Sequence, residues 1–184
     1  MTTRISVPIS ELDEDFLRKL KEKYAGYTRL DIQVVEMGDE PALKEEEFWH
    51  IIEKLDWSAT TPEAVLAPAV QALAEHPLGH IFQFEDMLAT KLQALDTRRH
   101  AARAYPEPEP FSEDGFLYAR AAVLASGQER YKQVVQDPTQ MPADEDFEPL
   151  LSLVASAYQT KTGQPFDYIS PISYETYANA EGWQ

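Results

Sequence analysis

The sequence predicts a mostly α-helical protein with a small β-α-β element at its N-terminus, so the fold class is α+β overall. Two patterns support this prediction. From about residue 44 onward, apolar residues recur every three or four positions, which is the spacing of one helix face. Before that point, residues 4–7 and 30–34 alternate polar and apolar side chains, as half-buried strands do, on either side of a helical stripe.

The N-terminal element is expected to span residues 1–40. Pro8 ends the first strand, Ser10 suits a helix N-cap, and Gly26 suits the end of that helix. Two parallel strands alone leave unpaired N–H and C=O groups at both edges. We therefore expect this element to pair with a second copy of the chain, giving a homodimer through the N-terminal strands, or with a partner protein. A strand from the C-terminal tail is the third alternative.

The remaining residues, 44–184, are expected to form a helical bundle-like domain that ends in an aromatic C-terminal tail. The longest helix should run from His80 to Ala104. The helix before it should be kinked, or begin late, because Pro68 falls inside its pattern. The apolar stripes predict a core of side chains that are almost fully buried and in contact: Phe84, Leu88, Leu92, Phe116, Leu151 and Val154.

Composition restricts the classes of partner. The 184 residues carry a formal net charge of −16, and no segment is basic. Because neutralisation of phosphates drives most nucleic-acid affinity, we expect no nucleic-acid partner, and the same charge disfavours an anionic membrane. The field would instead attract a basic protein, although solubility alone is a common reason for acidic charge.

The absence of cysteine excludes disulfides, thiol nucleophiles and thiolate metal sites. The first residues lack the apolar core of a signal peptide, and the apolar stretches are too short to cross a bilayer. We therefore expect a cytoplasmic protein.

Four polar residues are spaced to share one face of the predicted long helix, because Asp96, Arg99, His100 and Arg103 lie at i, i+3, i+4 and i+7. One interpretation is a polar pocket that binds an anion or performs acid–base chemistry. The favoured interpretation is an Asp96–His100 surface pair, with arginines near a helix C-terminus where the helix dipole favours cations.

Arg120 and Tyr118 lie within an otherwise apolar helical run, and an arginine is costly to bury there without a partner. We expect the Arg120 guanidinium to pair with a carboxylate, either Asp96 or Asp114. The alternative is an arginine at the helix edge whose charged end reaches solvent.

Other catalytic arrangements are not supported. Glu85 and Asp86 are adjacent, and adjacent helical residues diverge by about 100°, so they cannot face each other as a hydrolase pair does. The chain has no phosphate-binding glycine loop and no Gly-x-Ser-x-Gly motif. We therefore expect no catalytic residue, no cofactor and no metal, since four histidines form no metal-binding motif: His50, His76, His80 and His100.

A set of packing motifs runs through about residues 45–168: Glu47–Leu55, Phe84–Thr97, Gly115–Arg120, Gly127–Tyr131, Asp137–Pro138 and Phe147–Gly163. With these motifs the chain resembles a bacterial family catalogued as domain of unknown function 4240. That family has no established activity, so the resemblance implies no mechanism, cofactor or site residue.

Two function hypotheses follow. The first is a non-enzymatic protein-binding or regulatory protein with an acidic interaction surface, such as an antitoxin-like or immunity-like protein that neutralises a basic partner. The second is an enzyme or small-ligand binder that uses a polar pocket around Asp96, His100 and Arg120. A deep pocket lined by these groups would favour the second hypothesis, whereas a flat acidic face would favour the first.

Overall fold

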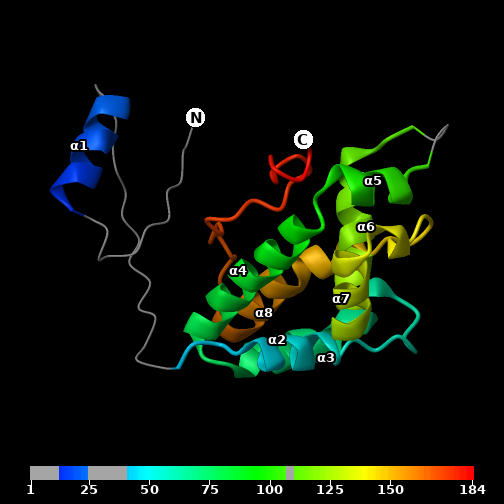
Figure 1. The fold of residues 1–184 in the computed structure, drawn as a ribbon. Helices are drawn as coiled ribbons and strands as arrows, with labels where there is room; N and C mark the ends of the chain where they lie inside the picture. Colours follow the sequence, from blue (N-terminus) through cyan, green and yellow to red (C-terminus); the bar gives the residue numbers. More distant parts are fainter. Residues whose placement is uncertain (1–12, 25–40, 107–109) are drawn as a thin grey trace.

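The computed structural model describes residues 13–24, 41–106 and 110–184, and the fold described below is that of these residues. Within them the chain is helical and has no β-strand (Figure 1). The helices in chain order are α1 (Glu14–Lys23), α2 (Glu45–Ile52), α3 (Pro62–Glu75), α4 (Leu78–Ala94), α5 (Arg98–Ala104), α6 (Glu113–Ala125), α7 (Gln128–Gln136) and α8 (Leu153–Thr162), with two 3₁₀-helices, η2 (Pro138–Gln140) and η3 (Glu148–Ser152).

The prediction of an α+β class with an N-terminal β-α-β element is wrong, because the described chain is mostly α and contains no strand. The stretches expected as strands, residues 4–7 and 30–34, lie outside the described residues. The helix expected between them is α1, which is capped by the Asp13 carboxylate. No residue of α1 is buried, so its apolar stripe covers no sheet. The homodimer expected through these strands is not tested by the described residues.

Local sequence signals start and end several of the other helices. Thr61 caps α3 by accepting a hydrogen bond from the third residue of the helix, and Pro62 takes the first helical position. Ser112 caps α6 in the same way. At the other end of the chain, α8 stops at Gly163, whose φ of 70° suits a residue without a side chain. Pro68 lies inside α3 without ending it.

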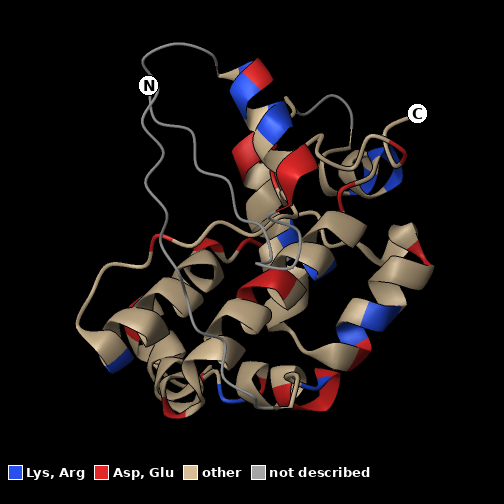
Figure 2. Cartoon of the chain, turned by 90° about the vertical axis from the view of Figure 1, so that its left-hand side faces the viewer, with Lys and Arg blue, Asp and Glu red and all other residues tan. Residues whose placement is uncertain are grey.

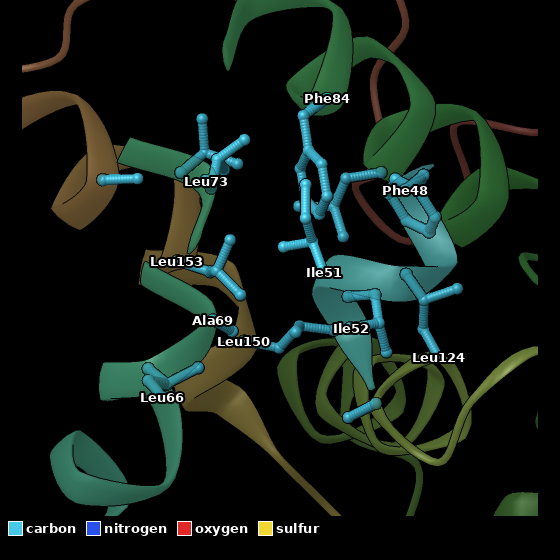
Figure 3. Close-up of a cluster of buried hydrophobic side chains, with 14 of the residues drawn as sticks. Phe48, Ile51, Ile52, Leu66, Ala69, Leu73, Phe84, Leu124, Leu150 and Leu153 are labelled. Atoms are coloured by element: carbon cyan, nitrogen blue, oxygen red, sulfur yellow. The ribbon is translucent and has the colours of Figure 1, made fainter. Parts of the chain in front are cut away.

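The main core lies where α2, α3, α4, α6 and α8 meet. α8 packs against α3 and α4, and α6 packs against α4. Side chains from several helices point toward one another in Figure 3, with Phe48 and Ile51 of α2 facing Leu73 of α3 and Phe84 of α4. The Phe48 and Phe84 rings stack with centroids 4.4 Å apart. Burial of these faces is the main source of stability, because short helices are marginal in water on their own.

A second, smaller core cluster lies beneath α5, α6 and α7. It contains Leu95, Phe116, Val134 and Met141, each of them fully buried, with Trp183 from the end of the chain packed against it. This cluster matters for the site because Leu95 lies at the junction between α4 and α5, and the cluster packs that junction against α6 and α7.

The predicted core is confirmed with two corrections. Leu151 is only partly buried, and Phe116 belongs to the smaller cluster rather than to the main one. The 3₁₀-helix η3 directly precedes the last helix, α8. The other predicted core residues are at most 1% exposed and belong to one cluster: Phe84, Leu88, Leu92 and Val154.

Charged residues lie over the outside of these helices. Figure 2 shows acidic positions on several elements, with basic positions between them, rather than on one face alone. On α1, for example, Asp15 forms ion pairs with both Arg18 and Lys19. In the described part of the chain, no helix combines the length and the apolar character needed to cross a membrane.

Leu92 offers a direct test of the core, because its side chain is 0% exposed. Leu92→Ala should lower the free energy of unfolding by about 2–5 kcal/mol, since it removes buried apolar area and leaves a cavity. Urea unfolding measures this change, and Val135→Ala, at a residue 39% exposed, is the matched control that should cost far less. A loss below about 1 kcal/mol for Leu92→Ala would contradict the packing described.

Candidate functional site

The predicted long helix is interrupted at residues 95–97, and this break positions Asp96. α4 ends at Ala94, and the Thr97 side chain then caps α5 by accepting from the backbone N–H of His100 at 3.3 Å. The prediction of one helix from His80 to Ala104 is therefore wrong. The spacing that grouped Asp96 with the polar residues of α5 does not apply across the break.

The Asp96 carboxylate is completely buried and accepts three hydrogen bonds from the end of the chain. Its Oδ1 accepts from the indole Nε1 of Trp183 at 2.9 Å and from the backbone N–H of Tyr177 at 3.3 Å. Its Oδ2 accepts from the backbone N–H of Asn179 at 3.0 Å. Burial of a carboxylate is costly in free energy unless its oxygens are hydrogen-bonded. These three donors therefore offset the cost of burying Asp96.

Arg120 of α6 is also completely buried. One terminal nitrogen donates to the backbone carbonyl of Leu92 at 3.0 Å, and the other donates to the Thr176 hydroxyl, also at 3.0 Å. The guanidinium carbon lies 4.8 Å from the centroid of the Phe116 ring, a cation–π contact. Its Nε has no hydrogen-bond partner.

The expected direct ion pair of Arg120 with Asp96 or Asp114 is not formed, because the guanidinium bonds to a carbonyl and a hydroxyl instead. The alternative, an arginine that reaches solvent, is wrong as well. Burial lowers the pKa of Arg120 to about 10, and the negative charge of Asp96 opposes this shift. Arg120 therefore stays protonated at neutral pH and interacts with Asp96 at longer range.

Residues 173–184, which we call the C-terminal strap, complete this site. Besides the bonds to Asp96 and Arg120, strap carbonyls accept from α5. The backbone N–H of Arg98 donates to Gly182 O at 2.9 Å, and the Arg98 guanidinium donates to Trp183 O at 2.8 Å. The Asn179 amide donates to Gln93 O of α4 at 3.2 Å. The strap thus packs on the helices through backbone groups as well as aromatic rings.

Aromatic rings close the strap over the site. Trp183 lies edge-to-face with Phe116 and with Phe111, at centroid distances of 6.1 Å in both cases. The Tyr177 ring lies 4.5 Å from Trp183. Such contacts add to the burial of apolar area and exclude water from the bonds beneath.

His100 is buried but does not pair with Asp96. Its Nε2 lies 3.0 Å from the backbone carbonyl of Val134, which can only accept, so Nε2 carries the proton. Its Nδ1 then accepts from the Thr97 hydroxyl at 2.7 Å. Burial lowers the pKa of His100, and nearby guanidinium charges lower it further. The favoured Asp96–His100 pair is therefore wrong, and this histidine links α5 to α7 as a neutral group.

The other predicted polar residues lie apart from the Asp96 site. Arg99 is exposed, and Arg103 is exposed with its Nε donating to Thr139 O at 3.2 Å. Tyr118 is half-buried on α6, where desolvation raises the pKa of its hydroxyl and the charge of Glu148 raises it further. The structure thus brings together Asp96 and Arg120, but not Arg99, Arg103 or Tyr118.

Sequence reasoning missed a surface hollow that we call the Trp57 groove. It has a volume of about 430 Å³ and is lined by Trp57, Ala122, Ser126, Asp144, Glu145, Asp146 and Phe147. Trp57 is 57% exposed, and its ring lies 5.0 Å from that of Phe147. The three consecutive acids are all exposed. The sequence did contain one signal for this groove. Trp57 lies between the polar residues Asp56 and Ser58 and on no apolar stripe, which indicates an exposed tryptophan.

A second hollow, of about 420 Å³, is lined by Glu46, Glu47, His50 and His76. Beside it, the Nδ1 atoms of His76 and His80 lie 3.2 Å apart, and Nε2 of His80 lies 2.8 Å from Pro41 O. A carbonyl only accepts, so a proton on Nε2 of His80 leaves its Nδ1 to accept from His76. In the described part of the chain, no group of three or more histidine or acidic residues is arranged to hold a metal.

Glu85 and Asp86 have separate surroundings, in line with the expectation that they do not face each other. The Tyr168 hydroxyl donates to the Asp86 carboxylate at 2.9 Å. Glu85 is only 8% exposed. Desolvation raises the pKa of the half-buried Tyr174 hydroxyl in the strap, and the charge of Glu85 raises it further. Burial raises the pKa of Glu85 to about 7, and the charge of Asp86 adds to this effect. The Glu85 carboxyl group is therefore partly protonated at neutral pH.

Residues from three of the recognised motifs meet around the Lys91 ammonium. It lies 2.6 Å from a Glu45 oxygen and 4.9 Å from the centroid of the Trp49 ring, with Tyr131 and Phe48 at 5.3 and 5.5 Å. A cation among aromatic faces is stabilised by the negative charge of those faces, so these motif residues hold α2, α4 and α7 together.

The fold therefore defines a helical domain whose polar centre is closed by its own C-terminus. A family model described as "Protein of unknown function (DUF4240)" matches residues 43–160, and the chain belongs to this family. This confirms the resemblance found in the sequence. No curated protein and no solved structure matches the chain. Asp96 and Arg120 lie within the matched region, whereas the C-terminal strap lies beyond it.

Glu85 makes the stability of the protein depend on pH. Because its pKa is raised from 4.5 to about 7 on folding, the folded state binds the proton more tightly than the unfolded chain does. The free energy of unfolding therefore falls as the pH rises from about 4.5 to about 7, and it stays lower above that range.

Glu85→Gln keeps the neutral shape and should remove this part of the pH dependence. The free energy of unfolding of Glu85→Gln minus that of wild type should be larger at pH 8 than at pH 5. The increase should exceed about 1.4 kcal/mol, the equivalent of one pKa unit. Urea unfolding at both pH values measures it, with Glu53→Gln at an exposed position as the control. Parallel pH profiles for wild type and Glu85→Gln would exclude the shift.

Proposed function

We propose that this protein is a non-enzymatic binding protein whose partner is a basic protein, and that the Trp57 groove receives a basic side chain of that partner. The carrying observation is the exposed Trp57 beside Asp144, Glu145 and Asp146 in one hollow. Aromatic residues are enriched at protein interfaces, and tryptophan is prominent among their energetic hot spots.

The chemistry of the groove favours arginine or lysine as the residue bound. An aromatic face attracts a cation, and carboxylates bind a guanidinium through two parallel hydrogen bonds. The net charge of −16 supports the same partner class, since it speeds the approach of a basic protein. Neutralisation of such a partner, as antitoxins and immunity proteins do, is one concrete form of this role.

The alternative, an enzyme or small-ligand binder with a pocket around Asp96, His100 and Arg120, has less support. These three side chains are at most 3% exposed, and each is hydrogen-bonded to other parts of the chain. Neither of the two hollows described above is lined by any of them.

The proposal is tested by affinity purification of the tagged full chain from its native host, followed by mass spectrometry. A basic protein should co-purify with wild type and should be lost with Trp57→Ala. It should also be lost when the groove acids are neutralised together in Asp144→Asn/Glu145→Gln/Asp146→Asn. The matched control neutralises three exposed acids elsewhere, in Glu53→Gln/Glu63→Gln/Glu129→Gln, and should retain the partner.

Thermal unfolding of each variant separates loss of the groove from loss of the fold. Binding of the captured protein, measured by calorimetry, should weaken as the salt concentration rises, because the attraction is between charges. Equal capture by wild type and both groove variants would contradict the proposal, as would a partner that is acidic.

A further inference from the structure

We propose that the Asp96–Arg120 site is a peptide-binding site, and that the C-terminal strap is its resident and displaceable ligand. This inference is independent of the Trp57 groove. It assigns the site a ligand of defined chemistry, which is a segment of successive turns that presents backbone N–H groups and an indole.

The contacts are those of a peptide held by its backbone. Asp96 accepts from the main-chain N–H groups of Tyr177 and Asn179, and Arg98 donates to the carbonyls of Gly182 and Trp183. Peptide-recognition sites commonly combine main-chain hydrogen bonds, which supply affinity, with side-chain contacts, which supply specificity. Here the Trp183 indole supplies the specific contact, because it both donates to Asp96 and packs on Phe116.

The strap depends on the site for its order. Residues 164–184 form no helix and no strand, and the backbone hydrogen bonds within the strap are those of short turns, such as Ala178 N–H to Glu175 O and Gly182 N–H to Asn179 O. Tyr177, whose N–H bonds to Asp96, has a φ of 75°, which is unfavourable for a residue with a side chain. Release of the strap relieves this strain, which makes docking reversible at a lower cost than unfolding of a packed helix.

The helices position the receptor side of the site, although Asp96 and one Arg120 nitrogen lose their strap partners when the strap leaves. Asp96 is placed by the break between α4 and α5, and Arg120 is held by its bond to Leu92 O and by the Phe116 ring. Arg120 Nε is buried without a partner, so the strap leaves one donor of the site unused. The family model ends at residue 160, which places the receptor residues inside it and the strap outside.

Gly182 gives the means to test this idea in the full chain. A Cβ atom there would lie 2.8 Å from Thr97 Cγ2 and 2.9 Å from the backbone oxygen of Asp96, too close for either contact. Gly182→Ala should therefore weaken docking of the strap and leave the helical core unchanged. Glu181→Ala, at the exposed neighbour, is the matched control.

The probe is a fluorescently labelled synthetic peptide of residues 173–184. Its binding is measured by fluorescence anisotropy. It should bind the Gly182→Ala protein, and should bind wild type and Glu181→Ala at least tenfold more weakly. The reason is that a tethered strap has an effective concentration of the order of millimolar and outcompetes free peptide. Asp96→Asn in the Gly182→Ala background should weaken peptide binding roughly 10- to 100-fold, as expected for hydrogen bonds to a charged acceptor.

Two further measurements distinguish release of the strap in Gly182→Ala from unfolding of the whole protein. A peptide with Trp183→Ala leaves the protein unchanged and should bind at least tenfold more weakly than the original peptide. Hydrogen exchange of the Tyr177 and Asn179 amides should be faster in Gly182→Ala than in wild type, while α4 amides stay protected. If these strap amides remain as protected as those of α4, or if the peptide shows no binding up to millimolar concentration, the strap is a fixed part of the fold and the proposal is wrong.

Discussion

The constraint on which the site depends is the burial of a carboxylate at a helix break. Asp96 is 0% exposed, and a carboxylate removed from water requires donors for its oxygens. The start of α5 does not supply them, because the Arg98 N–H donates to Gly182 O and the His100 N–H donates to the Thr97 hydroxyl. Three donors from the C-terminal strap meet the requirement. The position of one side chain between α4 and α5 thus determines where the end of the chain must lie.

Arg120 shows the complementary solution for a buried cation. Its charge is balanced by a carbonyl, a hydroxyl, the face of Phe116 and the more distant Asp96, rather than by an ion pair. Removal of one partner from such an arrangement leaves a buried polar group unpaired, which costs more than the bond itself contributed. Polar centre and strap therefore stabilise each other, while the Trp57 groove lies on residues that take no part in this network.

The sequence predicted the helices well because their signals are local. Apolar stripes, the Thr61 and Ser112 caps and the Gly163 stop each act within one or two turns. It failed where the outcome depends on distant residues. The apolar stripe that continues to Leu95 concealed the break, although Thr97 is a good N-cap. The partners of Asp96 lie more than 80 positions away, in a segment without periodicity.

The central claim is that Asp96 and the strap are energetically coupled. A double-mutant cycle between Asp96→Asn and Trp183→Phe measures this coupling directly, because the second change removes the indole N–H and keeps an aromatic ring. From urea unfolding of the four proteins, we predict a coupling free energy of about 1–3 kcal/mol. If the two losses in the free energy of unfolding add to within about 0.5 kcal/mol, the indole–carboxylate bond does not hold the strap and the account is contradicted.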